Sequence, residues 1–145
     1  IGSPYWNADA KAAIIGITRE TNKEHLARVC LEGIALSVND SINALATDLG
    51  FDIDEIRVDG GASMNSLLMQ IQSNFSNQKI SRPQIIETTA YGVSIGSLVG
   101  LNSISFKQVS TLWKQDKEFK PATNPYFEHK KEMWKSYISR NFIKE

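Results

Sequence analysis

One long amphipathic stretch constrains the fold of this chain more than any other feature of its sequence. Between Leu26 and Leu49, apolar and small side chains recur every three or four residues, which is the period of an α-helix. Thr21 and Glu24 have the spacing of a capping box before this stretch, and Gly50 is suited to end it. We therefore predict a helix about 40 Å long with one apolar face. That face consists of Leu26, Val29, Cys30, Gly33, Ile34, Ser37, Val38, Ile42, Leu45 and Leu49.

Shorter patterns on both sides of this helix alternate between strands and helices. Strands are predicted at residues 13–17, 55–59 and 78–81, and an extended segment at residues 116–119. Helices are predicted at residues 63–75, after a cap at Thr88 or Thr89, at residues 106–113, and from a first turn at Pro125. This alternation indicates an α/β fold with a mixed, mainly parallel sheet flanked by helices. No linker divides the chain, so residues 1–145 are predicted to form a single domain.

The helix after the two threonines is unusually rich in glycine. Gly92, Gly96 and Gly100 each cost about 1 kcal/mol relative to alanine inside a helix. Close packing against a sheet or a ligand would explain why such a helix is tolerated, and we expect such packing here.

Charge balance and cysteine content exclude several classes of protein. The 16 Lys and Arg residues balance 16 Asp and Glu residues, which argues against a nucleic-acid-binding surface. No apolar run approaches the roughly 18 residues of a membrane-spanning helix, and the start has no signal-peptide pattern. Cys30 is the only cysteine, which excludes an intramolecular disulfide and fits a cytoplasmic location. On the apolar face of the long helix, Cys30 is expected to be a small buried hydrophobe.

The segment at residues 58–65 contains the strongest candidate for a binding site. Gly60 and Gly61 lack Cβ atoms, so the backbone can take unusual conformations there and a ligand can approach it closely. The following helix presents unpaired N–H groups that attract phosphate, and Asn65 lies one turn further on. Asp59 could hold the turn through backbone amides or orient a metal-bound water. A plain tight turn fits the spacing equally well, because the segment has neither a Walker loop nor a Gly-x-Gly-x-x-Gly fingerprint.

The other candidates have structural explanations. His25 and His129 lack the spacing of metal ligands, so a zinc site is not expected. Glu32 and Asp40 on the long helix are expected to be solvated or paired with a nearby arginine. The aromatic loop at residues 3–6 is interpreted as a plug for the core rather than as a platform for a ligand.

Several blocks of the sequence, in order, resemble glycerol kinases of the FGGY carbohydrate kinase family. The matching blocks are residues 2–7 (Gly-Ser-Pro-Tyr-Trp-Asn), 13–19, His25, Arg28, 31–35, 57–62, Asn65, 68–73, 82–83 and 87–92. The Pro-Tyr-Trp block and the one ending in Thr-Arg separate glycerol kinases from other sugar kinases of the superfamily. The resemblance covers nearly the whole chain and fades after about Lys107.

This resemblance implies a partial actin-like (ribonuclease-H-like) ATPase domain. It would be the C-terminal, nucleotide-binding domain of a two-domain carbohydrate kinase, without its N-terminal portion. The full enzyme, expected to be a homo-oligomer, would use ATP and Mg²⁺ to convert glycerol to glycerol 3-phosphate and ADP. Gly61 and Asn65 match positions that contact the nucleotide, while Gly60 and Ala62 shape the same turn. The catalytic aspartate and the glycerol site are expected upstream of Ile1, so no catalytic or metal-binding residue is assigned here and the chain alone should be inactive.

Some positions depart from the family pattern. Tyr91 stands where leucine is usual, Val93 and Ser94 replace two alanines, and Leu36 and Ser37 replace a Tyr-Gln pair. The larger side chains after the threonines could alter how closely that helix approaches the nucleotide turn. Two alternative functions therefore stay open: another sugar kinase of the superfamily, such as a pentulose kinase, or a non-catalytic nucleotide-binding or interaction module.

Overall fold

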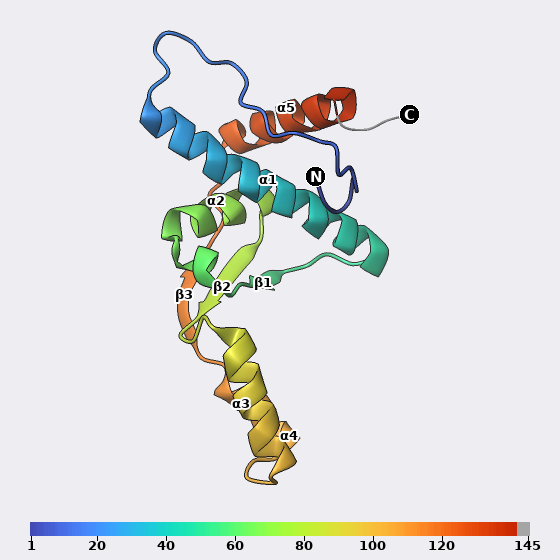
Figure 1. Ribbon diagram of the computed structural model, residues 1–145, viewed down its shortest axis with the longest axis vertical. Helices are drawn as coiled ribbons and strands as arrows, with labels where there is room; N and C mark the ends of the chain where they lie inside the picture. The colour runs from blue at the N-terminus through green and yellow to red at the C-terminus, as the bar shows by residue number, and fades with distance from the viewer. Residues whose placement is uncertain (142–145) are drawn as a thin grey trace.

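The computed structural model describes residues 1–141 and contains a small mixed sheet with helices packed around it (Figure 1). The elements in order are α1 (Lys23–Leu49), β1 (Glu55–Arg57), a 3₁₀ turn η1 (Gly61–Met64), α2 (Ser66–Ser76), β2 (Lys79–Pro83), α3 (Thr88–Gly100), α4 (Phe106–Leu112), β3 (Gln115–Phe119) and α5 (Pro125–Asn141). Strands lie in the order β1-β2-β3, with β1 and β2 parallel and β2 and β3 antiparallel. The prediction of an α/β fold with a mixed sheet is therefore confirmed, but the sheet has one parallel and one antiparallel pair and is not mainly parallel.

The core forms around α2, which packs against α1, β2, β3 and α5. Phe75 on α2 is fully buried and meets Phe127 of α5 edge to face, with ring centroids 5.1 Å apart. Ile80 of β2 is also fully buried. The buried apolar cluster consists of Ala35, Leu36, Leu68, Met69, Ile71, Phe75, Ile80, Phe119 and Phe127. Three helices and two strands thus share one core, which holds β1 and the turn after it in place.

The two ends of α1 show which local signals decide where a helix begins and stops. Gly50 takes a left-handed conformation (φ 71°) and ends α1, as predicted. At the other end the N-cap is Asn22, whose side-chain oxygen accepts a hydrogen bond from the N–H of His25, and the His25 ring completes the capping box. The prediction of a box from Thr21 to Glu24 was wrong by one residue. The Thr21 hydroxyl oxygen instead accepts a hydrogen bond from the N–H of Thr18.

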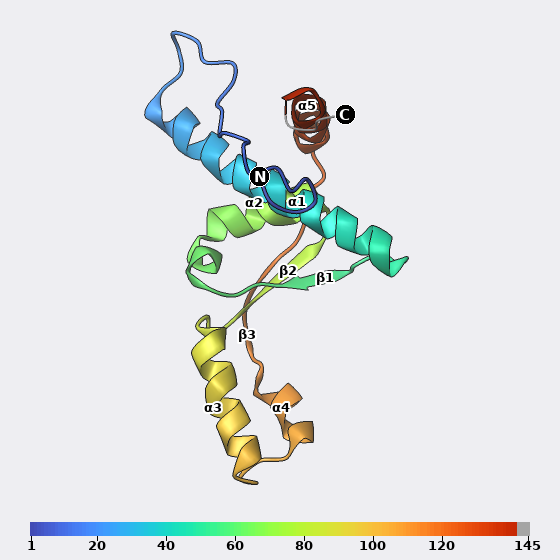
Figure 2. The same ribbon diagram turned by 45° about the vertical axis from the view of Figure 1, so that its right-hand side comes forward.

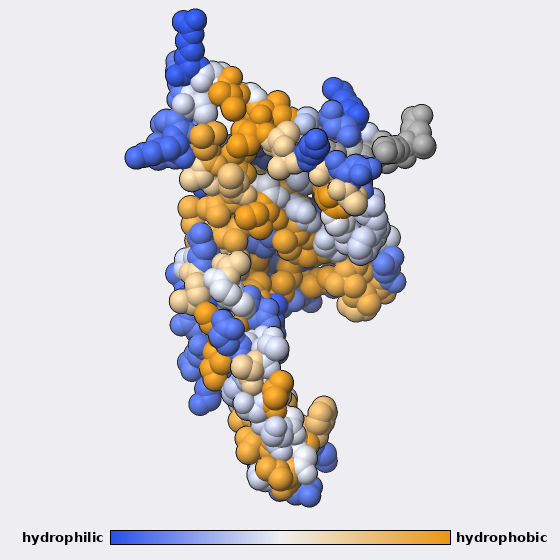
Figure 3. Space-filling view, in the orientation of Figure 1, coloured by the Kyte–Doolittle hydropathy of each residue, from blue (hydrophilic) through white to orange (hydrophobic). Residues whose placement is uncertain are grey.

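Most of the predicted apolar face of α1 is turned away from the core, although Ile42 of that face is buried. The buried positions of this helix are Glu32, Ala35, Leu36, Asn39, Asp40 and Ile42. By contrast, Ile34 and Leu45 of the predicted apolar face are each 51% exposed, and Cys30 is exposed rather than buried. Apolar surface is accordingly visible over the upper part of the molecule, where α1 lies (Figure 3). Periodicity predicted the helix correctly, but α1 packs through the neighbouring, more polar stripe.

Glu32, the first of two buried carboxylates on this stripe, binds α5. The side chain of Arg28 donates from Nε to Glu32 at 2.6 Å, and the Tyr126 hydroxyl donates to both Glu32 oxygens at 2.9 and 3.0 Å. Burial, followed by the hydrogen bond to Glu32, raises the pKa of Tyr126. The expected pairing with an arginine is confirmed for Glu32, and the carboxylate also anchors the start of α5.

Asp40, the second buried carboxylate, joins both ends of the chain to α1. Its Oδ2 accepts hydrogen bonds from the Tyr5 hydroxyl at 2.8 Å and from the Trp134 indole at 2.5 Å. Burial, together with the hydrogen bond to Asp40, raises the pKa of Tyr5 to about 12. Asp40 is 8% exposed, so the expectation of a solvated or arginine-paired group was wrong for this residue.

The segment before α1 is irregular and lies beside that helix (Figure 2). No strand forms at residues 13–17, where Gly16 has φ +82°, a left-handed conformation that interrupts an extended chain. Ile15 and Ile17 are more than 60% exposed. Trp6 is 79% exposed, so the aromatic loop is not a core plug; it contacts α1 through Tyr5. Both predictions for this segment were wrong, because a strand and a plug each need neighbours that the described residues do not supply.

Helices α3 and α4 form an arm that extends away from the sheet (Figures 1 and 2). Neither helix has a buried residue, and a Cβ at Gly92, Gly96 or Gly100 would meet no atom within 4 Å. The expected close packing of these glycines is therefore not found among residues 1–141. Among the described helices, none is both long and apolar enough to cross a membrane.

Candidate functional site

The Gly60 turn follows β1 at the open edge of the sheet. After the parallel pairing of β1 with β2, the N–H of Val58 donates to the carbonyl of Ser81 at 3.1 Å. The N–H of Gly60 then donates to the carbonyl of Ile86 at 2.9 Å. Gly60 has φ 74° and ψ 173°, a conformation that side chains disfavour, so glycine is required here. The start of the turn is thus held by hydrogen bonds to the carbonyls of Ser81 and Ile86.

A 3₁₀ turn, rather than an α-helix, follows the glycines. The Ser63 N–H and hydroxyl both donate to the carbonyl of Gly60, at 3.1 and 2.7 Å, and the N–H of Asn65 donates to the carbonyl of Ala62 at 3.1 Å. The α-helix predicted from Ser63 begins at Ser66, because these short-range bonds close the chain more tightly first.

Asn65 joins the 3₁₀ turn to α2. Its side-chain Oδ1 accepts hydrogen bonds from the N–H groups of Leu67 and Leu68, each at 3.1 Å. The residue is thus the N-cap of α2 and at the same time exposed to solvent. Because the oxygen caps the helix, the amide nitrogen is the atom available to donate to a ligand.

The predicted site residues lie together on an accessible surface. Gly60 is half-buried, while Gly61, Ala62 and Asn65 are exposed. A Cβ at either glycine would meet no atom within 4 Å outside the adjacent residues, so the backbone is open to close approach at these two positions. The N–H groups at the start of a helical turn have no carbonyl partner within that turn. The N–H groups of Gly61 and Ala62 therefore make no hydrogen bond within η1. The arrangement can therefore accept a group that approaches the backbone closely and takes hydrogen bonds from it.

Asp59 connects the turn to the arm. The hydroxyl of Thr88 donates to the Asp59 carboxylate. Thr88 is the first residue of α3, and neither threonine is its cap; the N-cap is Glu87, which makes no side-chain capping bond. The predicted capping was wrong, and the Thr88 hydroxyl is used instead for this link between the segment after β1 and α3. The sequence had suggested that Asp59 holds the turn through backbone amides or orients a metal-bound water, whereas its carboxylate accepts the hydrogen bond from Thr88.

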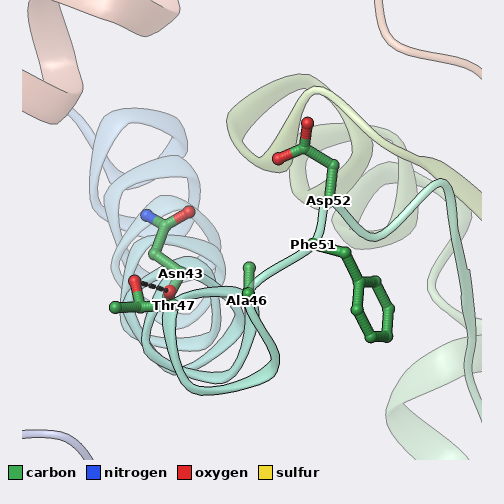
Figure 4. Close-up of a pocket in the computed structure, with 6 residues that line it drawn as sticks. Asn43, Ala46, Thr47, Phe51 and Asp52 are labelled. Atoms are coloured by element: carbon green, nitrogen blue, oxygen red, sulfur yellow. Dashed lines mark hydrogen bonds between the residues drawn. The ribbon is translucent and has the colours of Figure 1, made fainter.

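A separate open hollow lies between the last turns of α1 and the residues that follow this helix (Figure 4). It is lined by Asn43, Ala46, Thr47, Gly50, Phe51 and Asp52. The Thr47 hydroxyl donates to the carbonyl of Asn43 at 2.9 Å, so this hydroxyl is already used within the helix. Within residues 1–141, no group of three or more His, Cys, Asp or Glu side chains is placed to hold a metal ion. The Gly60 turn is accordingly the best candidate site.

Comparison with known proteins decides the family of this chain. Residues 1–100 match the model of the C-terminal domain of the FGGY family of carbohydrate kinases. The chain belongs to the FGGY family of carbohydrate kinases. A glycerol kinase of Clostridium perfringens is 41% identical over 97% of this chain, and one of Dichelobacter nodosus is 47% identical over 86% of it.

Solved structures of FGGY kinases share the fold. The glycerol kinase of Plasmodium falciparum, whose crystal structure is with ADP, matches 99% of this chain with a TM-score of 0.84 and 28% identity. A xylulose kinase from Brucella ovis matches 94% with a TM-score of 0.83 at 18% identity, which bears on the fold alone. The predicted actin-like fold class is confirmed. The chain spans 25–29% of the length of the glycerol kinases named above, and 29% of each of the two solved kinase chains.

Proposed function

We propose that this chain is part of an ATP-dependent glycerol kinase and supplies part of the ADP/ATP pocket. The observation that carries the proposal is the identity of about 40% with glycerol kinases over nearly the whole chain. In this proposal residues 1–145 are the C-terminal, nucleotide-binding domain of a two-domain enzyme. The full enzyme is cytoplasmic and a homo-oligomer, and acts on ATP and glycerol.

The nucleotide contacts are assigned to Gly60, Gly61, Ala62 and Asn65. Their support is the exposed turn described above, where no atom lies within 4 Å of a Cβ position at the glycines. The N–H groups of Gly61 and Ala62 donate to acceptor atoms of the nucleotide, and the Asn65 amide nitrogen adds a side-chain donor. Gly60 keeps the backbone in the left-handed conformation that starts the turn.

The chain's own residues bind and orient the nucleotide rather than perform the reaction. Bound Mg·ATP supplies the phosphoryl group for transfer to the glycerol hydroxyl. Positioning and electrostatic stabilisation account for most of the catalysis of phosphoryl transfer, so a rigid turn contributes by holding the nucleotide in one place. The general base that takes the glycerol proton and the residues that bind glycerol are assigned to the part of the enzyme outside this chain.

A substrate panel on the full-length protein tests the proposal. Glycerol, a pentulose and gluconate are each offered with Mg·ATP, and ADP release is followed. We expect the highest kcat/KM with glycerol. A preference for the pentulose would assign the chain to a different FGGY kinase, and no ATP-dependent phosphorylation of any of them would favour a non-catalytic nucleotide-binding module.

Calorimetry on the 145-residue chain tests the proposal that this chain supplies only part of the nucleotide pocket. Titration with Mg·ADP is expected to give weak binding, because one wall of the pocket is assigned to residues outside the chain. Submicromolar affinity would contradict that assignment, since it would require an essentially complete pocket.

A further inference from the structure

Arg82 contacts the segment that follows Gly60; the sequence placed it only within the matching block 82–83 and gave it no role. It belongs to β2 and is 8% exposed. Its Nη1 donates to the carbonyls of Ser63 at 3.1 Å and Met64 at 3.3 Å, and lies 3.4 Å from the Ser66 hydroxyl. One guanidinium nitrogen therefore contacts the last two residues of η1 and the first residue of α2.

The rest of the guanidinium group is fixed by the neighbouring strand. Nε and Nη2 of Arg82 donate to Oδ2 of Asp116 at 2.9 and 2.8 Å, and the group lies over the ring of Phe119, 5.7 Å from its centroid. Both partners belong to β3. The side chain of Arg82 thus has one edge on β3 and the other on the turn, and it cannot move without breaking contacts on both sides.

We propose that Arg82, held by Asp116, is a positioning residue that fixes the Gly61–Asn65 segment for nucleotide binding. The proposal rests on the proposed function, because the nucleotide is the ligand assigned to that segment. Arg82 does not touch the nucleotide in this assignment; it acts through the carbonyls of Ser63 and Met64. These carbonyls lie between Gly61 and Asn65, so fixing them sets the distance between the two proposed nucleotide contacts.

A planar group with several donors is needed for this role. The guanidinium presents five N–H donors in a rigid plane, whereas a lysine ammonium is a single point of charge. A lysine at this position can reach Asp116 or the carbonyls of the turn, but it cannot span both edges. The substitution Arg82→Lys therefore separates the positioning role from the need for a positive charge beside Asp116.

Lys79 provides a matched control on the same strand. Its Nζ pairs with Glu55 of β1 at 3.2 Å and with Glu118 of β3 at 3.7 Å, so it also bridges neighbouring strands. Within the described residues it makes no hydrogen bond or ion pair with the turn. Lys79→Gln removes a cation from β2 and leaves the Gly61–Asn65 segment untouched.

The test uses the full-length protein and four variants: Arg82→Gln, Arg82→Lys, Asp116→Asn and Lys79→Gln. We expect Arg82→Gln to raise the KM for ATP about tenfold or more, as the loss of charged hydrogen bonds implies, with the KM for glycerol within about twofold. Arg82→Lys should recover little of this loss, and Asp116→Asn should give a smaller rise of the same kind. Lys79→Gln should leave both KM values unchanged.

Hydrogen exchange gives a second readout that does not depend on activity. Amides at residues 61–65 are expected to exchange about tenfold faster in Arg82→Gln and Arg82→Lys, with no change in Lys79→Gln. Unchanged exchange and an unchanged KM for ATP in the Arg82 variants would overturn the proposal, and so would equal effects in Lys79→Gln. If Arg82→Gln does not fold, Arg82→Lys and Asp116→Asn decide. If the wild-type protein has no kinase activity, the proposed function fails, while the exchange rates still test the role of Arg82.

Discussion

Substitution of Asn65 separates the capping role that the structure shows for this side chain from the nucleotide-binding role that we propose for it. The Oδ1 atom caps α2 through the N–H groups of Leu67 and Leu68, and the amide nitrogen is the proposed nucleotide donor. Asn65→Ala removes both. Loss of an N-cap costs about 1 kcal/mol, which lowers the melting temperature of a chain of this size by roughly 3 °C. A weaker interaction with ATP in this variant would therefore have two explanations.

Asn65→Asp removes the donor and adds a negative charge, but it keeps an oxygen that can cap α2. A carboxylate oxygen accepts the same two N–H bonds, and a negative charge at the start of a helix is favourable, so the melting temperature should equal or exceed that of the wild type. The same charge repels the phosphates and the donor is gone, so the KM for ATP should rise at least about tenfold, equivalent to about 1.4 kcal/mol.

Thermal melts of this chain and ATP titrations of the full-length enzyme at saturating glycerol measure the two effects. Asn77→Asp places the same change at the opposite end of α2, where Asn77 has a left-handed conformation, and should leave the KM for ATP unaltered. A wild-type KM in Asn65→Asp would refute the reasoning, because Asn65 would then serve α2 alone.

Three further predictions concern the packing of the chain. Phe75→Ala removes the fully buried ring at the centre of the core and should cost about 3–5 kcal/mol of unfolding free energy in urea titrations; a loss below about 1 kcal/mol would contradict that position. Because the folded-state pKa of Tyr5 is raised to about 12 from an ordinary value of 10, its contribution is present below pH 10 and lost between pH 10 and 12. The melting temperature of the wild type should thus fall more steeply over that interval than that of Tyr5→Phe, and parallel curves would exclude the hydrogen bond to Asp40. Replacing the exposed Ile34 and Val38 of α1 by glutamate should change the free energy of unfolding by less than about 0.5 kcal/mol. The same change should reduce self-association, measured by light scattering at high protein concentration. A large loss of stability would instead show that this face is buried.

Sequence patterns located most elements of this fold because they reflect local backbone preferences. Three of these signals depend only on residues within one or two helical turns: the period of α1, the glycine that ends it and the proline that begins α5. Each lies at the predicted place. Asn22 and Thr21 are adjacent residues that can both cap a helix, so the sequence could not choose between them. Residues 13–17 are rich in strand-forming side chains, but a strand also requires a partner to complete its hydrogen bonds.

The side on which α1 packs could not be predicted in the same way. The hydrophobic pattern assumes that the most apolar face is buried, yet the described chain buries the stripe with Glu32 and Asp40, whose carboxylates have aromatic hydrogen-bond partners. Tyr126 and Trp134 are each 94 residues away in sequence from the carboxylate that they contact, and Tyr5, the other partner of Asp40, is 35 residues away. Only the three-dimensional arrangement shows that the charges are satisfied and that this stripe can be buried.

At the candidate site, the sequence identified the turn but not its support. Gly60 and Gly61 indicate a break after a strand, because glycine allows backbone conformations that other residues avoid. Arg82 lies 18 and 19 residues beyond the carbonyls that it contacts, and its position depends on the parallel register of β1 and β2. No spacing rule relates these residues, so the supporting contact emerges only after the sheet is assembled.

The double use of Asp40 has a consequence for the order in which the chain assembles. Tyr5 is 35 residues before it and Trp134 is 94 residues after it, so both contacts close long loops. Such contacts are entropically expensive and are expected to form after the more local packing of α1 on α2. Asp40→Asn should therefore accelerate unfolding and leave the folding rate nearly unchanged. On this account the contacts of Asp40 determine the unfolding rate, while the packing of α2 determines the folding rate.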